Sequence, residues 1–142
     1  MEQNARRRLE DVLDREIEVA RALAATLAAE RTALTGDSPQ AVEQNAAEKI
    51  RILATIEQLE AERRDLWAEP NLGLAATIAE RWRALMELMA GCRIANEVNG
   101  HIIHVRQHQI GQLIDIVRGG PAITYGPQGK TFAKALRALA RA

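Results

Sequence analysis

Apolar side chains recur every three or four residues along the first segment of the chain, the spacing that places them on one face of an α-helix. The positions of this face are Leu9, Val12, Glu16, Val19, Leu23, Leu27, Glu30 and Leu34, widened by Leu13, Ile17 and Ala20. The pattern predicts one long amphipathic helix over residues 3–35.

A second helix is predicted over residues 39–68. The segment Thr35-Gly36-Asp37-Ser38-Pro39 supplies a helix-ending glycine, an N-cap serine and a proline suited to the first helical position. The apolar face is then carried by Val42, Ala46, Ile50, Leu53, Ile56, Leu59 and Leu66, with Glu57, Glu60, Glu62, Arg63 and Arg64 on or beside its solvated flank. Glu69-Pro70-Asn71-Leu72-Gly73 ends the helix.

The third periodic segment is the longest and predicts a helix over residues 74–118, ended by Gly119-Gly120-Pro121. Short connections favour an all-α fold in which the three helices run up, down and up as an antiparallel bundle in a single domain, residues 1–142. At about 1.5 Å per residue the first two helices reach roughly 45–50 Å and the third nearly 70 Å. We therefore expect the third helix to overhang after about residue 104.

This third helix carries apolar residues on two sides. Its core stripe runs through Leu85, Cys92, Asn96, Ile103, Ile110 and Ile114. A turn of about 100° per residue places a second stripe well outside it, formed by Ile94, Val98, Ile102, Val105 and Ile116. The corresponding positions of the first half include Arg81, Arg83 and Glu87. A helix that is apolar on two sides needs two partners.

The tail, residues 119–142, offers one candidate partner. Phe132, Leu136 and Leu139 are spaced for a short C-terminal helix, with Lys134, Arg137 and Arg141 around it. A helix of about twelve residues is marginal alone, so this one could dock on the second stripe, detach from it or be displaced by a ligand.

Asn96 and Asn99 fall at core-stripe positions and precede Gly100, which lowers helix stability by about 1 kcal/mol relative to alanine. Two explanations remain open. The asparagines could form a polar layer that fixes helix register, with Gly100 admitting another backbone, or they could mark a kink or contact point where the binding half begins.

Composition narrows the class of partner. Nineteen basic and nineteen acidic residues cancel, so no global positive field favours nucleic acid or an anionic membrane, and the partner is expected to be protein. A single cysteine, Cys92, excludes a disulfide framework and fits a reducing cytoplasm. No apolar run approaches the roughly 20 residues of a membrane span, and the N-terminus lacks a signal peptide's apolar core. We expect a soluble, unprocessed protein without membrane insertion.

Two motifs suggest chemistry but lack its requirements. Gly126-Pro127-Gln128-Gly129-Lys130-Thr131 ends like a phosphate-binding loop, yet Thr124 stands where the first glycine is needed. His101, His104 and His108 share one helical face that incidental metal could reach, but no carboxylate or thiolate completes a site. No serine or cysteine nucleophile is paired with a base. We therefore expect no enzyme, no cofactor and no physiological metal.

One stretch of sequence suggests a family. It contains Cys92-Arg93-Ile94-Ala95-Asn96-Glu97-Val98-Asn99-Gly100-His101-Ile102-Ile103, then Arg106, Leu113 and Arg118-Gly119, then Tyr125-Gly126-Pro127-Gln128-Gly129. Together these residues resemble the FlgN family of flagellar export chaperones. The combination of two asparagines, a glycine and isoleucines with a later Tyr-Gly-Pro-x-Gly is more discriminating than either part alone. Glu48-Lys49-Ile50 and Leu59-Glu60 near Arg63-Arg64 fit the same resemblance.

The resemblance implies a cytoplasmic bacterial protein that binds hook-associated proteins of the hook–filament junction and delivers them to the flagellar type III export gate. The client's C-terminal helical segment would lie on the third helix, and the tail would contact the export gate through Tyr125, Gly126, Pro127 and Gly129. The expected partner-binding residues are Asn96, Val98, Asn99, Gly100, Ile102, Ile103, Val105, Arg106, Ile110, Leu113, Ile116 and Val117. Gln109 and Gln112 interrupt the second stripe.

Two alternatives use the same residues differently. A structural coiled-coil protein would self-associate through the second stripe, as a homodimer for example, and would bury it permanently. A histidine-linked metal sensor would bind metal through His101, His104 and His108.

Overall fold

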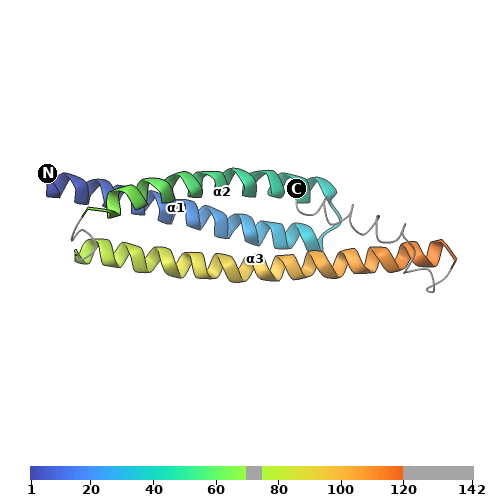
Figure 1. The fold of residues 1–142 in the computed structure, drawn as a ribbon. Coiled ribbons are helices and arrows are strands. Elements are labelled where there is room, and N and C mark those ends of the chain that lie inside the picture. The colour runs from blue at the N-terminus through green and yellow to red at the C-terminus, as the bar shows by residue number, and fades with distance from the viewer. Residues whose placement is uncertain (70–74, 120–142) are drawn as a thin grey trace. The chain divides into compact units, whose positions relative to one another are not determined.

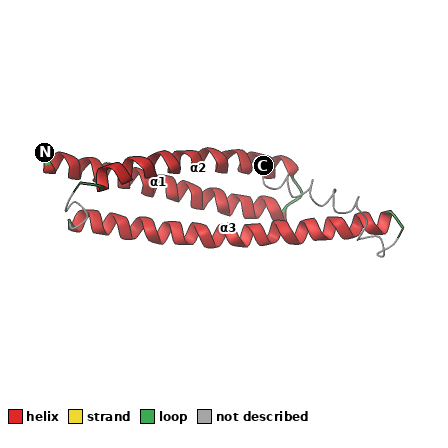
Figure 2. Cartoon of the chain, in the orientation of Figure 1, coloured by secondary structure: helices red, strands yellow, loops and turns green. Residues whose placement is uncertain are grey.

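The computed structural model describes residues 1–69 and 75–119. Three helices account for nearly all of them: α1 (Glu2–Thr35), α2 (Pro39–Trp67) and α3 (Ala76–Val117). The described part of the chain contains no strand (Figure 2). The predicted all-α fold class is therefore confirmed. Contacts divide the chain at Asn96, inside α3, into two compact units that are described separately below.

The connection between α1 and α2 follows from local sequence. Ser38 is the N-cap of α2, because its side-chain oxygen accepts a hydrogen bond from the backbone N–H of Ala41 at 3.2 Å. Pro39 occupies the first turn, where its missing N–H removes no helical hydrogen bond. Gly36 lies in an extended conformation and its N–H donates to the carbonyl of Ala33 at 3.2 Å. Its role at the end of α1 therefore does not depend on a left-handed backbone.

Within the first unit, residues 1–96, ion pairs define how the helices run. Arg15 pairs with Glu62, and Glu30 farther along α1 pairs with Lys49 near the start of α2. The partners shift toward the start of α2 as α1 proceeds, so these two helices are antiparallel, side by side as in Figure 1. Asp14 of α1 pairs with Arg81 of α3, and farther along both helices the Cys92 thiol donates a hydrogen bond to the backbone carbonyl of Ala20. The partners follow the same order in both helices, so this part of α3 runs in the direction of α1.

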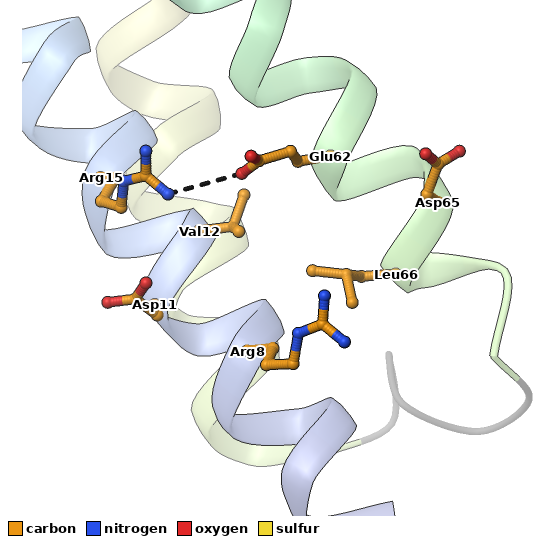
Figure 3. Close-up of a pocket in the computed structure, with 7 residues that line it drawn as sticks. All are labelled: Arg8, Asp11, Val12, Arg15, Glu62, Asp65 and Leu66. Atoms are coloured by element: carbon orange, nitrogen blue, oxygen red, sulfur yellow. Dashed lines mark hydrogen bonds and ion pairs between the residues drawn. The ribbon is translucent and has the colours of Figure 1, made fainter.

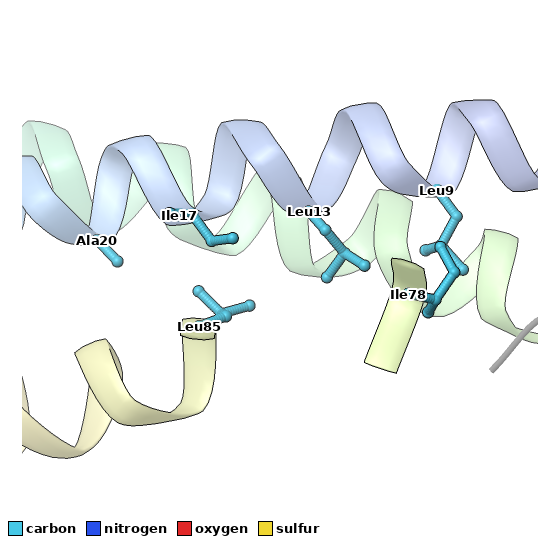
Figure 4. Packing of buried hydrophobic residues seen from close by; sticks show 6 residues of the cluster. All are labelled: Leu9, Leu13, Ile17, Ala20, Ile78 and Leu85. Carbon is cyan, nitrogen blue, oxygen red and sulfur yellow. The ribbon is translucent and has the colours of Figure 1, made fainter. Parts of the chain in front are cut away.

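Two hydrophobic clusters hold this unit together. In the first, Leu9, Leu13, Ile17 and Ala20 of α1 meet Ile78 and Leu85 of α3 (Figure 4). In the second, Leu23 and Leu27 of α1 meet Ile52 of α2 and Cys92 of α3. Burial of side chains of this size stabilises the fold by about 1.5–3 kcal/mol each. All three helices therefore contribute buried side chains to the interior of residues 1–96, in two clusters.

The predicted apolar face of α2 is wrong at two positions. Ile50 and Leu53 are 58% and 43% exposed, whereas Ile52, absent from the predicted face, is 5% exposed. Positions 50, 53, 56 and 59 are three residues apart, so each step falls about 60° short of a full turn. The series therefore passes from the outer side of α2 at Ile50 to the buried side at Leu59.

Candidate partner-binding surface

The second half of α3 exposes large apolar side chains. Val105 is 40% exposed, Leu113 61%, Ile116 67% and Val117 85%. They lie on one continuous helix, so their order around its axis follows from about 100° per residue. Val105 and Ile116 belong to the second stripe predicted from the sequence, and Leu113 flanks it. Exposed aliphatic side chains gathered on one helix provide an apolar face for another helix.

The remaining members of the second stripe differ in exposure. Val98 and Ile102 are half-buried, and Ile94, in the first unit, is 60% exposed. Gln109 and Gln112 are exposed within the stripe and supply amide groups beside the apolar carbons. A ligand on this face would therefore meet two apolar sections, around Ile102 and around Ile116, separated by polar side chains.

The core stripe of this half is also incompletely covered. Asn99 is 2% exposed and Ile103 and Ile114 are half-buried, whereas Ile110 is 44% exposed. Arg106, half-buried, lies beside this stripe. All members of the predicted partner-binding set thus lie on α3, but they occupy two faces rather than one.

Asn96 and Asn99 have different surroundings. The buried Asn99 has a bonding partner, as a buried amide requires. Asn96 is exposed, and its Oδ1 accepts a hydrogen bond from Lys49 Nζ at 2.6 Å. The same ammonium donates to the carboxylate of Glu30 at 3.3 Å. Asn96 therefore connects α3 to α2 and, through Lys49, to α1.

Gly100 has free space around it. A Cβ atom built at this position meets no atom of residues 1–69 and 75–119 within 4 Å. Among these described residues, no other backbone approaches Gly100 as the sequence led us to expect. Gly119 differs, because its φ of 108° is a conformation that side-chain-bearing residues rarely adopt.

The predicted export-gate residues Tyr125, Gly126, Pro127 and Gly129 lie outside the described residues, as does the predicted C-terminal helix. The phosphate-loop-like segment also lies there. No structural observation bears on these interpretations.

Sequence reasoning missed a charged cluster in the first unit. The sequence pattern places Arg63 on or beside the solvated flank of α2, but its side chain is only 14% exposed. Its Nε donates to both oxygens of the buried Glu16 carboxylate, at 3.1 and 3.0 Å, and its guanidinium carbon lies 4.8 Å from the ring centre of Trp82. Trp67 meets Trp82 edge to face at 5.2 Å. The signal in the sequence was Glu16 itself, an acid on an apolar face.

Burial affects the pKa of Glu16 more strongly than Arg63 does. Removal from water raises the pKa of the Glu16 carboxyl above its ordinary value, and the hydrogen bond and charge of Arg63 offset part of that rise. Burial also raises the pKa of the Cys92 thiol, which disfavours the nucleophilic thiolate. Neither group is arranged for catalysis.

A cavity of about 370 Å³ opens between α1 and α2 near the first helix's start (Figure 3). Its walls mix both signs of charge, and Arg15 and Glu62 pair across it at 3.4 Å with about half of each side chain exposed. The lining residues are Arg8, Asp11, Val12, Arg15, Glu62, Asp65 and Leu66. Charges that pair with one another in solvent provide neither a nucleophile nor a selective ion site.

Among residues 1–69 and 75–119, no three histidine, cysteine, aspartate or glutamate side chains are placed to hold a metal ion. The exposed His101, His104 and His108 are included in that range. Within the same residues, no helix is long and apolar enough to cross a membrane.

Comparison with known proteins identifies the family of the chain. The family model described as FlgN protein matches residues 1–132. The flagella synthesis protein FlgN of Yersinia enterocolitica is 30% identical over 132 residues, which are 86% of this chain and 88% of that protein. No solved structure matches the chain. Because the family match covers most of its length, the chain belongs to the FlgN family, a family of flagellar chaperones and not of enzymes.

Proposed function

We propose that this protein is a flagellar export chaperone of the bacterial cytoplasm. Its clients are the hook-associated proteins of the hook–filament junction, whose C-terminal helical segments it binds and delivers to the type III export gate. The observation that carries the proposal is the exposed apolar surface of α3, centred on Val105, Leu113 and Ile116, in a chain of the FlgN family.

The binding step is burial of one helix face against another. An amphipathic client helix removes the second stripe from water and loses its own apolar exposure at the same time. At roughly 25 cal/mol per Å², a few hundred Å² of apolar burial offsets the cost of ordering the client. Gln109 and Gln112 provide donors and acceptors that favour one client register over its neighbours.

Covering the client before export also explains how the complex prevents premature assembly. A terminal amphipathic helix that is free in solution can associate with other copies, whereas one held on α3 has its apolar face occupied. The chaperone then needs no chemistry to act. In this proposal Tyr125, Gly126, Pro127 and Gly129 contact the export gate, a role that rests on the family resemblance.

The decisive experiment changes Ile102 and Val105 to glutamate together. Binding of a junction protein's C-terminal segment, measured by calorimetry, should weaken at least 100-fold, because two charges would enter an apolar contact. The helical circular dichroism signal should be retained. A matched control is available one residue earlier, where His101→Glu and His104→Glu introduce the same side chains at the same spacing on the exposed polar face.

The control variant should bind the segment within about threefold of the unchanged protein, because its new charges remain in water. Equal weakening by both variants would point to charge repulsion rather than loss of an apolar contact. Unchanged binding by the Ile102 and Val105 variant would show that the proposed surface is wrong. Sedimentation over a wide concentration range separates this proposal from obligate self-association, which would leave no monomer.

A further inference from the structure

The exposed Ile50 on the outer side of α2 belongs to a regular series of exposed positions. They follow one another at alternating intervals of four and three residues and fall within roughly 100° of one another around the helix axis. Ile52 and Leu59, which are buried, lie on the opposite side of α2. We call this series the outer seam, and its members are Glu43, Ala47, Ile50, Ala54, Glu57, Ala61 and Arg64.

The outer seam has the spacing by which one helix packs along another. Alternating intervals of four and three residues keep the contact positions nearly in line over many turns. The seam's three alanines, seven residues apart, put no long side chain in front of the α2 backbone, so a second helix can approach closely and fit its own bulky side chains between them. Ile50 and the neighbouring Leu53, both exposed, supply large apolar contacts on the same side.

The charges of α2 determine which kind of helix fits. Each of the four cations of this helix forms an ion pair with a carboxylate: Lys49, Arg51, Arg63 and Arg64. Acidic residues outnumber these cations by six to four in α2. The seam carboxylates Glu43 and Glu57 form no ion pair with any of residues 1–69 and 75–119. The outer seam therefore presents negative charge that this part of the chain does not neutralise.

We infer that the outer seam is a docking face for a helix of another protein, one with bulky apolar side chains in the same four-three repeat and with lysine or arginine residues facing Glu43 and Glu57. These two carboxylates are fourteen residues apart, about 21 Å along the helix, so the partner's cations recur at the same interval. Nucleic acid and anionic membranes are repelled by the same carboxylates. The face lies on α2, whereas the proposed client surface lies on α3, so the inference adds a second binding surface.

A second copy of this chain fits the outer seam less well than a basic helix does. Ile50 is the only large apolar member of the seam, so a self-paired seam gains most of its apolar contact when Ile50 meets Ile50. In the parallel orientation this register sets Glu43 against Glu43 and Glu57 against Glu57. In the antiparallel orientation it sets Glu43 against Glu57 twice. Like charges that face each other across an interface oppose binding, so the required cations come from a different chain.

Two synthetic peptides test the charge requirement on the full-length chain. Both are helical designs about four heptads long with leucine in a four-three repeat, and they differ only in carrying lysine or glutamate at the flanking positions. Calorimetry below the concentration at which the peptides self-associate should show one lysine peptide bound per chain, with an affinity at least about tenfold higher than that of the glutamate peptide. In the double variant Glu43→Lys with Glu57→Lys this preference should reverse.

Matched variants separate the outer seam from the rest of the surface. Glu18→Lys with Glu87→Lys makes the same change of charge at exposed acids of α1 and α3, and this double variant should still prefer the lysine peptide. Ala54→Gln puts a long side chain into the seam and should weaken binding of the lysine peptide at least about tenfold. Ala25→Gln, the same change at an exposed position of α1, should leave that affinity within about twofold. The helical circular dichroism signal should be retained in all four variants.

Three results would overturn the inference. The first is equal affinity of the unchanged protein for the two peptides. The second is binding that the seam variants leave unchanged, or that the control variants weaken as much as the seam variants do. The third is a dimer in sedimentation that Ala54→Gln disrupts, which would identify a second copy as the occupant of the outer seam.

Discussion

Arg63 on α2 donates its Nε–H to both carboxylate oxygens of Glu16 on α1, at 3.1 and 3.0 Å, and both side chains are largely removed from solvent. Replacing Arg63 by alanine leaves a buried carboxylate without its cation and removes the guanidinium from the Trp82 ring. We expect the free energy of unfolding to fall by about 3 kcal/mol or more. Denaturant titration of the purified variant measures this change.

The adjacent residue provides the control for that experiment. Arg64 is 73% exposed and pairs with Glu60 at 3.6 Å. An ion pair in solvent contributes little, so Arg64→Ala should change the free energy of unfolding by less than about 1 kcal/mol. Similar losses in both variants would mean that helix propensity or net charge, rather than the buried pair, accounts for the effect.

Glu16 also makes a specific contribution to the pH dependence of stability. Because its pKa is raised in the folded protein, the folded state retains a proton that the unfolded chain has lost above about pH 4.5. We therefore compare the unchanged protein with Glu16→Gln by subtracting the variant's free energy of unfolding. This difference should fall as the pH rises from about 4.5 through the folded pKa, and then level off. Urea titrations of both proteins at several pH values measure the difference.

Arg63 provides an internal check on this pH effect. Its charge and hydrogen bond lower the Glu16 pKa, so without Arg63 the same pKa should rise further. When the same comparison is made in proteins that also carry Arg63→Ala, the difference in the free energy of unfolding should continue to fall to a higher pH. A difference that instead increased with pH would show that ionised Glu16 is favoured by the fold, contrary to the effect of its burial.

The sequence predicted three long helices because apolar periodicity depends only on local spacing. It placed Glu16 and Glu30 on the apolar face of the first helix, where they are indeed buried. It did not predict the cations that pair with them, Arg63 and Lys49, because a helical projection fixes the direction of a side chain but not how far a long one reaches across to another helix. The partners of buried charges depend on the packing of separate helices.

Prediction of the candidate site has a similar limit. The second stripe on α3 follows from periodicity within one helix, and the exposures of Val105 and Ile116 agree with it. Whether Ile50 and Leu53 face the interior depends on where α1 lies against α2, since α2 carries apolar residues on more than one side. The identity of a bound partner depends on a second molecule and so cannot follow from periodicity in this chain.

The hydrogen bond from Lys49 to Asn96 should contribute moderately to stability. Asn96→Ala removes the 2.6 Å contact, but Lys49 keeps Glu30 as a partner and water can reach its partly exposed ammonium. We expect a loss of about 1 kcal/mol in the free energy of unfolding. Glu97→Ala, an exposed neighbour, should change it by less than about 0.5 kcal/mol. A neutral Asn96→Ala would show that this contact does not hold α3 in place.

Tyr125→Ala tests whether client binding and delivery use separate parts of the chain. We expect the helical signal and the affinity for a junction protein's C-terminal segment to be unchanged, because the proposed client surface lies on α3. Export of junction proteins by cells carrying the variant should decrease. Calorimetry and an export assay measure the two properties separately. A matching loss of affinity would place Tyr125 in the client contact instead.

Gly100 and Gly119 should respond to alanine in opposite directions. A methyl group at Gly100 meets none of the described residues within 4 Å and alanine favours helix, so Gly100→Ala should raise the free energy of unfolding by about 1 kcal/mol. Gly119→Ala should lower it by about 1 kcal/mol, because its φ of 108° strains a side-chain-bearing residue despite the open space.

If Gly100→Ala is more stable yet binds the client less tightly, the added methyl group obstructs the client, and the missing side chain at Gly100 serves recognition. Stability gained with unchanged affinity would instead place the client away from Gly100, on the side of α3 that carries Val105 and Ile116.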